Sequence, residues 1–278
     1  MPITVHDDAV GERSLVAGNA VTITGATIGA NVPDFAALPA AVATALKGRT
    51  FRYIAPTSAA GGTISNLAIV SNTLSGSNTP ALTNADLRTA SSRVNTTTST
   101  ANVLVGHNFT DPGMCRGAVA GVGGFFFCHR LAIVALTADA VVSIGTNNAV
   151  IGGGADPAAT GNRIVLGAST GDTDLTIIST DNAATATKSA AVISKANAII
   201  GDPTTGGPRV MEVRMYALPN DTKVHVQVLD ISNGTTLFDG DITLTLPLNT
   251  TNLRPTAVLG PKSNANCQVD YIFFYGYW

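Results

Sequence analysis

The sequence is short of charge, of aromatic rings and of basic stretches. Of its 278 residues only 12% are Asp, Glu, Lys or Arg, against about 25% in ordinary globular proteins, and 5% are aromatic. The formal net charge is −2, and Lys and Arg do not cluster into a run. Nucleic acid and anionic membranes are bound mainly through clustered positive charge, so we expect neither as a partner.

The chain also shows no export signal and no run that is suited to spanning a membrane. Residues 1–15, MPITVHDDAVGERSL, are polar and acidic where a signal peptide is basic and then apolar. The most apolar stretch is GAVAGVGGFFFCHRLAIVAL (117–136), and a span needs about 20 mostly apolar residues. His129 and Arg130 interrupt it near its middle. We therefore expect cytoplasmic synthesis without a signal peptide.

Patterns for catalysis, cofactors and metals are missing as well. Gly121-Val122-Gly123-Gly124 is followed by phenylalanines and not by the helix that a dinucleotide fingerprint requires. GASTG (167–171) departs from the nucleophile motif GxSxG. Cys128 and His129, as neighbours on a strand, point to opposite faces and do not readily share a metal ion. We expect no enzyme, no cofactor and no metal, and we expect the three cysteines to be reduced: Cys115, Cys128 and Cys267.

What the chain does contain is a series of apolar runs separated by turn residues. From residue 116 these are GGFFFCHRLAIV, AVVSIG, RIVLGA, LTIIST, KSAAVI, RVMEVRMYA, KVHVQVLDI, DITLTL, TAVLG and QVDYIFFYG. The joints between them are rich in Asn, Asp, Gly and Pro, which suit hairpin turns. Many antiparallel strands without intervening helices predict an all-β chain, folded as an antiparallel β-sandwich of the jelly-roll or concanavalin-like kind.

The first part of the chain predicts a different organisation. VTITGATI (21–28) predicts a strand, and PDFAALPAAVATALKGR (33–49) predicts a short helix, because its apolar residues recur at helical spacing. We therefore divide the chain into a strand–helix attachment or packing segment, residues 1–55, and a sandwich domain, residues 56–278. The sandwich is best defined from about residue 116.

The turns and strands follow one another in an order that a known group of proteins shares. The pieces are Gly123-Gly124-Phe125 before a strand with Arg130, Gly167 with Gly171-Asp172-Thr173-Asp174-Leu175, Leu218-Pro219-Asn220, and Leu246-Pro247 through Thr250-Thr251-Asn252-Leu253-Arg254-Pro255. With LRTASSRVN (87–95), they resemble a β-sandwich module near the C-terminus of many tail fibres and related virion proteins of tailed bacteriophages. The resemblance covers roughly residues 85–278. It implies a structural virion protein, a homotrimer, at the surface or tail of the particle.

Within that resemblance, three roles stay open. The first is a short tail fibre or receptor-binding appendage that displays the sandwich for attachment to a host-surface glycan, with residues 1–55 binding other virion proteins. The second is a capsid decoration (cement) protein or head fibre that stabilises the shell. The third and weakest is a polysaccharide-cleaving tailspike, because acidic pairs and aromatic side chains are scarce.

Two stretches are candidate contact sites. Asp172 and Asp174 in GDTD either bind an ion or a sugar hydroxyl, or cap the backbone of their own turn. The last strand, QVDYIFFYGYW (268–278), is apolar on both faces, and such a strand aggregates when it is left at an open edge. We expect it to lie centrally in a sheet or under another subunit of a symmetric oligomer. The predicted subunit-interface residues are Tyr271, Phe273, Phe274 and Tyr275.

Overall fold

The computed structural model describes the following parts of the chain: residues 3–5, 13–15, 50–54, 77–78, 94–98, 100–108, 114–117, 123–149, 156–159, 161–182, 185–199 and 209–277. For strand residues before 100, and for 107, 108, 271–273, 275 and 277, the description covers the backbone alone. The predicted strand 21–28 and helix 33–49 lie outside the described residues. None of the described helices has the length and apolarity needed to cross a membrane.

Contacts divide the chain into two units, Met1–Leu38 and Pro39–Trp278. In the first unit, β1 (Ile3–Val5) pairs with β2 (Arg13–Leu15) as an antiparallel hairpin. In the second unit, β3 (Thr50–Ile54) pairs with β16 (Cys267–Tyr277). Residues 50–54, which the sequence-based division assigns to the N-terminal segment, thus contribute a strand to the sandwich.

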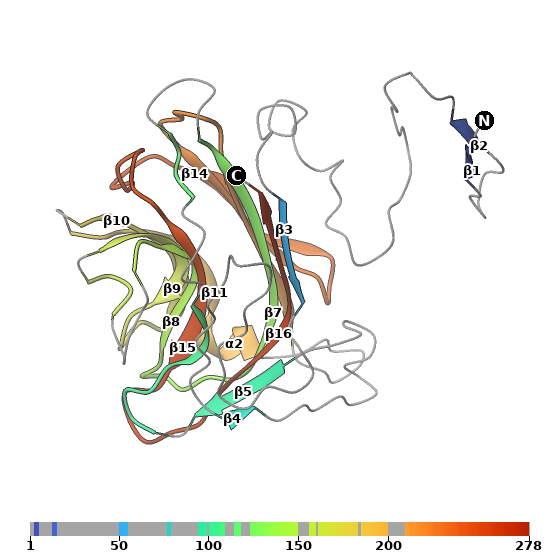
Figure 1. Cartoon of the computed structure of the whole chain (residues 1–278). Coiled ribbons are helices and arrows are strands. Elements are labelled where there is room, and N and C mark those ends of the chain that lie inside the picture. Colours follow the sequence, from blue (N-terminus) through green and yellow to red (C-terminus); the bar gives the residue numbers. More distant parts are fainter. Residues whose placement is uncertain are drawn as a thin grey trace. The chain divides into compact units, whose positions relative to one another are not determined.

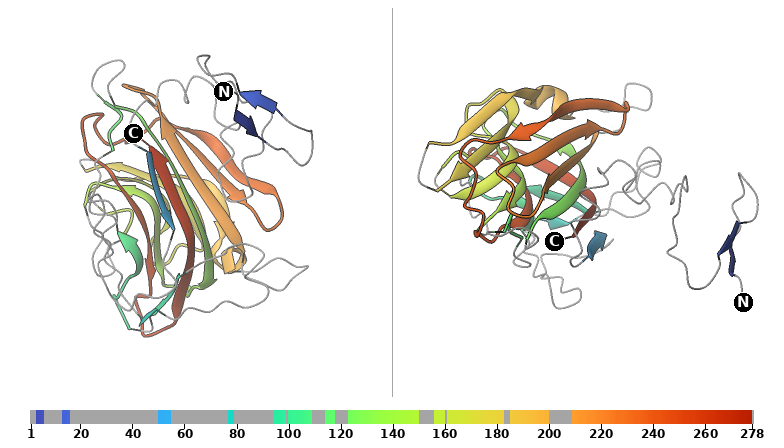
Figure 2. Two further views of the ribbon diagram at one scale, coloured as in Figure 1. Left: turned by 45° about the vertical axis from the view of Figure 1, so that its right-hand side comes forward. Right: turned by 90° about the horizontal axis from the view of Figure 1, so that it is seen from above.

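The second unit consists of two antiparallel sheets (Figures 1 and 2). The six-stranded sheet has the order β11 (Thr187–Ser194), β10 (Asp174–Asp181), β9 (Asn162–Ala168), β8 (Val141–Asn147), β15 (Arg254–Gly260) and β6 (Val105–Asn108). The eight-stranded sheet has the order β14 (Thr235–Ile242), β13 (Val224–Asp230), β12 (Val210–Ala217), β7 (Phe125–Ala135), β16, β5 (Val94–Thr98) and β4 (Ser77–Asn78), with β3 beside β16. The described helix is α2 (Lys195–Ile199), directly after β11. The predicted all-β antiparallel sandwich is confirmed.

The run DITLTL (241–246) predicts a strand, but of its residues only Asp241 and Ile242 belong to one, at the end of β14. β14 begins at Thr235, because the turn before it is tight and Gly234 adopts a left-handed φ of 64° that lets the chain pair again at once. The strand ends at Ile242, and the next residues leave the eight-stranded sheet to reach β15 in the other sheet. From Thr243 on, the alternation of apolar and polar residues that suggests a strand therefore belongs to a loop that connects the two sheets.

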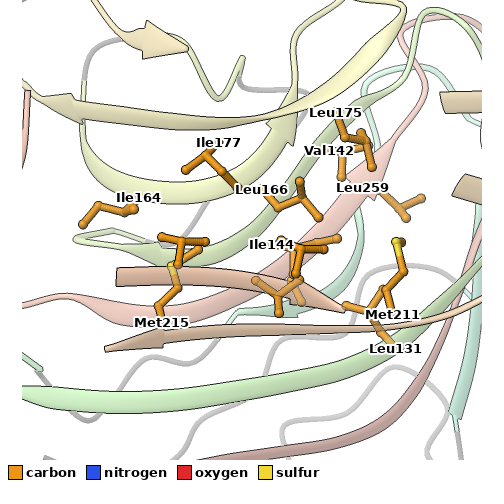
Figure 3. Packing of buried hydrophobic residues seen from close by; sticks show 14 of the residues in the cluster. Leu131, Val142, Ile144, Ile164, Leu166, Leu175, Ile177, Met211, Met215 and Leu259 are labelled. Carbon is orange, nitrogen blue, oxygen red and sulfur yellow. The ribbon is translucent and has the colours of Figure 1, made fainter. Parts of the chain in front are cut away.

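Alternating side chains fill the space between the sheets. Along β13, Val224, Val226 and Val228 are buried in the core, and the residues between them are partly exposed. Figure 3 shows the packing: Leu131, Met211 and Met215 come from the eight-stranded sheet, and Ile144, Ile164 and Leu166 come from the six-stranded sheet. Phe125 and Phe127 stack with their ring centroids 6.1 Å apart, so alternate phenylalanines of the FFF run line this core.

The last strand occupies a central position in its sheet. β16 pairs with β7 on one side, and with β5 and then β3 on the other, so both of its edges are hydrogen-bonded within this chain. Phe274 is buried in the core between the sheets. The side chains of Tyr271, Phe273 and Tyr275 lie outside the described residues, and their predicted place in a subunit interface stays a prediction.

His129 lies in the core, on the opposite face of β7 from Cys128. Its ring centroid lies 5.4 Å from that of Phe127 and 4.8 Å from that of Phe274. Burial lowers the pKa of His129 from 6.5 to about 3, against the effect of a hydrogen bond to the backbone of Gly145. On the other face, burial and the nearby carboxylate of Glu212 raise the pKa of the Cys128 thiol. The two side chains lie on opposite faces of β7, as the alternation along a strand predicts.

The buried histidine predicts a loss of stability in mild acid. Unfolded His129 takes up a proton below its ordinary pKa of 6.5, and the folded side chain stays neutral down to about pH 3. The free energy of unfolding therefore falls as the pH is lowered through this window. Between pH 7.5 and 4.5 the contribution is on the order of 3 kcal/mol. Urea denaturation at these two pH values should show a smaller loss for His129→Phe than for the wild type, and equal losses would contradict the assignment.

Candidate functional site

Four loops meet at one end of the sandwich, where β7 begins and β12 ends. They contain residues 114–117, 123–124, 218–223 and 243–253, and hydrogen bonds between their backbones connect them. We call this region the anchored end. It contains most of the turn sequences that carry the resemblance to the phage module, although these are far apart in the chain.

Arg116 joins three of these loops. Its Nη1 donates to the carbonyl oxygen of Asp221, and its Nη2 donates to that of Pro247 at 2.5 Å. Its own carbonyl oxygen accepts hydrogen bonds from the backbone N–H of Asn220 at 2.6 Å and of Gly124 at 3.1 Å. The residue is only 9% exposed, and burial lowers the pKa of its guanidinium, although the carboxylate of Asp221 acts in the opposite direction. Arg116 is thus a buried cation held by backbone oxygen atoms.

The glycine pair of the GGF sequence is required by this packing. Gly123 and Gly124 have φ angles of 90° and 86°, which L side chains rarely adopt. A Cβ at Gly123 would lie 2.5 Å from the Cα of Gly117, and a Cβ at Gly124 would lie 2.9 Å from the backbone nitrogen of Pro219. The glycines therefore allow the start of β7 to approach both neighbouring loops.

Residues 243–250 cross from β14 in one sheet towards β15 in the other, and they are attached at both sides. Ser179 of β10 donates from its hydroxyl to the Leu244 carbonyl at 2.8 Å, and the Thr245 hydroxyl lies 2.7 Å from that of Thr187. On the far side, the N–H of Gly117 donates to the Asn249 carbonyl at 2.8 Å. We call residues 243–250 the crossing loop.

The crossing loop combines backbone strain with exposed apolar side chains. Thr245 has a φ of 47°, a left-handed conformation that is costly for a β-branched residue. Leu244 is 64% exposed and Leu248 is 69% exposed, and they are the large hydrophobic side chains that the described part of the chain leaves exposed. Beside them, the Asn249 amide donates to the Asn220 side-chain oxygen at 3.1 Å.

The predicted ion or glycan loop lies at the opposite end, after β9. The carboxylate of Asp172 accepts from the Ser169 backbone N–H at 2.8 Å and from Lys188 Nζ at 2.6 Å. Burial raises the pKa of Asp172, but the hydrogen bonds and the charge of Lys188 outweigh it and the pKa is lowered. Asp174 accepts from the Thr173 hydroxyl at 2.8 Å. Asp172 therefore caps its own turn and already has a cationic partner, and ion or glycan binding by this loop stays a prediction.

Lys195 connects two turns at the same end through its ammonium group. Its Nζ donates to the backbone carbonyls of Ala138, Ala140 and Ser169 at 2.7, 2.8 and 3.3 Å, and the residue is 5% exposed. Burial lowers the pKa of Lys195, while the carboxylates of Asp172 and Asp139 raise it. The ammonium group thus links the β7–β8 turn to the β9–β10 turn. Among the described residues, no set of three or more His, Cys, Asp and Glu is arranged to hold a metal ion.

A row of polar side chains crosses the outer face of the eight-stranded sheet. Arg130, the arginine of the GGF strand, binds the buried Glu212 at 2.5 Å, and Glu212 also binds Arg214. The chain of contacts continues through Gln227, Asp239, His225, Asp241 and Lys223. Each of these groups already has a partner of opposite charge or a hydrogen bond within the row.

Sequence reasoning did not identify Arg116, Lys195 or the crossing loop as important. The one available signal for Arg116 was an isolated arginine between apolar and glycine residues, in a chain with few charges. Its partners lie 105 and 131 residues further along the chain, and no local pattern links them to it.

Comparisons with known proteins identify chains of similar fold, and they identify no family or function for this chain. No protein-family model and no curated protein matches the sequence. A protein of unknown function from Shewanella oneidensis MR-1 superposes with a TM-score of 0.53 and 13% identity, over 82% of this chain and 84% of that chain. Lectin II from Ulex europaeus gives a TM-score of 0.48 at 12% identity, covering 82% of this chain and 97% of the lectin. The Ca²⁺/Man2-bound exoplasmic/lumenal domain of VIP36 gives 0.49 at 10%, covering 81% and 86%. These likenesses assign no ligand to this chain.

The bonds of Arg116 predict a stability effect that is specific to the anchored end. Arg116→Met removes two hydrogen bonds from a cation to buried carbonyls, so we expect the free energy of unfolding to fall by about 3 kcal/mol. Lys223→Met at the same end removes only an exposed ion pair with Asp241, which solvent screens, and we expect a much smaller loss. Chemical denaturation measures both changes. Equal effects of the two substitutions would show that Arg116 does not hold the end together.

The two lysines of the opposite end form a second matched pair. Lys195→Met leaves three carbonyls without their donor, and we expect the free energy of unfolding to fall by about 2 to 4 kcal/mol. Lys188→Met breaks a partly exposed ion pair with Asp172, for which about 1 kcal/mol or less is expected. Thermal and urea unfolding of both variants checks this order, and a reversed order contradicts it.

Proposed function

We propose that the protein is a structural component of a tailed-phage virion, and that it displays its sandwich on a short tail fibre or receptor-binding appendage for attachment to the host surface. The observation that supports this is the anchored end. The pieces Gly123-Gly124, Leu218-Pro219-Asn220 and Leu246-Pro247, on which the resemblance to the phage module rests, are scattered in sequence and packed together in space. These pieces form one packed region of the chain, and this supports treating them as parts of a single module.

Each part of the chain has a role in this attachment. Residues before the sandwich bind other virion proteins, three copies assemble into the appendage, and the loops of the anchored end face outward to the host. The role is one of binding and not of catalysis. A chain with few surface charges suits a surface that contacts uncharged polymers, because it has little electrostatic attraction to offer to charged ones.

Locating the protein in particles tests this function. Mass spectrometry of particles purified from the source strain should detect the protein, and immunogold electron microscopy should place it at the tail. The purified protein should also reduce adsorption of the particles to their host by competition. Labelling of the capsid, with loss of shell stability when the protein is depleted, would replace the appendage by a decoration protein. Absence from particles would refute both virion roles.

A further inference from the structure

The crossing loop has an unusual surface chemistry. The crossing loop lies within residues 242–253, ITLTLPLNTTNL, which contain no charged side chain. Leu244 and Leu248 in this stretch are exposed. Burying a leucine side chain is worth about 1.5 to 3 kcal/mol, so two leucines held in water on one loop leave binding energy unused. Single exposed leucines are ordinary in proteins, but here both lie four residues apart on one fixed loop.

The loop is ordered before it meets any partner. Hydrogen bonds from Ser179, Arg116 and Gly117 hold the carbonyls of Leu244, Pro247 and Asn249. Thr245 keeps a left-handed backbone that is maintained only where the surroundings determine it. A loop fixed in this way loses little conformational entropy on binding, so contacts made by its exposed side chains translate more fully into affinity.

The size of this surface argues for a small ligand. A stable protein–protein contact buries about 800 Å² on each partner, and two leucine side chains with a few polar neighbours offer much less. The absence of charge argues against phosphorylated or carboxylated polymers and against anionic lipid, which are bound through Lys and Arg. Of the cations at this end, Arg116 is buried against the carbonyls of Asp221 and Pro247, and Lys223 is paired with Asp241.

The side-chain amides of Asn220 and Asn249 lie beside the crossing loop. The bond between the Asn249 and Asn220 amides occupies one polar atom of each side chain, and the other polar atom of each has no partner among the described residues. Amides that both donate and accept suit the hydroxyl groups of a sugar, and apolar side chains suit its C–H faces. A neutral ligand that presents both hydroxyl groups and C–H surface matches this arrangement.

We propose that the crossing loop, with the Asn220–Asn249 amide pair, is the contact site for a neutral saccharide of the host surface. This inference rests on the proposed attachment function and assigns it to one place and one chemical class. It also sets the crossing loop against the Asp172–Asp174 loop at the opposite end of the sandwich, for which the sequence left ion or sugar binding open beside turn capping.

The experiment uses the full-length protein, the double variant Leu244→Ser/Leu248→Ser and the matched control Asp172→Asn/Asp174→Asn. Both leucines are exposed, so the double variant should keep the unfolding midpoint of the wild type, and denaturation checks this first. The probes are polysaccharide extracted from the bacterium on which the particles grow, separated into neutral and anionic fractions, and phosphatidylcholine vesicles with and without phosphatidylglycerol. Binding to the immobilised probes is measured by surface plasmon resonance.

We expect the wild type and the aspartate variant to bind the neutral fraction, and the leucine variant to bind it about tenfold more weakly or worse. Equal binding by the leucine variant, binding of the wild type to the anionic fraction or vesicles alone, or no binding to any probe overturns the inference. Adsorption assays keep this separate from the proposed function. If the wild-type protein competes with particles for host cells and the leucine variant competes equally well, attachment stands and the assigned site is wrong.

Discussion

The guanidinium of Arg116 lies buried between backbone carbonyls that belong to loops 105 and 131 residues further along the chain. A buried cation is unfavourable unless oxygen atoms replace its lost water, so its position requires that these loops stay where they are. Lys195 does the same at the other end with three carbonyls. A chain with few charges therefore places Arg116 and Lys195 among its buried residues, where each holds together turns that are distant in the sequence.

Much of the sandwich was predictable because strands and turns are encoded locally. The alternation in KVHVQVLDI and the continuous apolar run of AVVSIG correspond to β13 and β8, and turn residues mark most strand ends. The exception is DITLTL, which alternates as a strand does but leaves β14 after Ile242 and continues into the crossing loop. Alternation indicates which side chains face inward and not whether the backbone has a neighbouring strand. The order of strands was not predictable, since β16 pairs with segments that begin at residues 50, 94 and 125.

The candidate sites show the same limit. Asp172 and Asp174 attracted attention because carboxylates in a turn have the same sequence signature whether they bind an ion or cap a backbone. What separates the two cases is Lys188, sixteen residues away on β11, whose ammonium lies against Asp172. The exposed leucines gave no signal at all, because a leucine in an alternating run is expected to be buried. Sequence patterns therefore drew attention to residues with charged groups and not to apolar residues that the folded chain leaves exposed.

The outer face of the eight-stranded sheet and the anchored end differ in what they offer to the proposed ligand. On the outer face of the eight-stranded sheet, charged groups from Arg130 to Lys223 bind one another, and a ligand there would have to break existing bonds to form its own. At the anchored end, hydrogen bonds connect the backbones of the loops, while Leu244 and Leu248 are exposed and one polar atom of each of the Asn220 and Asn249 amides has no partner among the residues that the structure describes. A ligand at this end gains contacts without losing any that the folded protein already makes, and Arg116 keeps the loop in place for it.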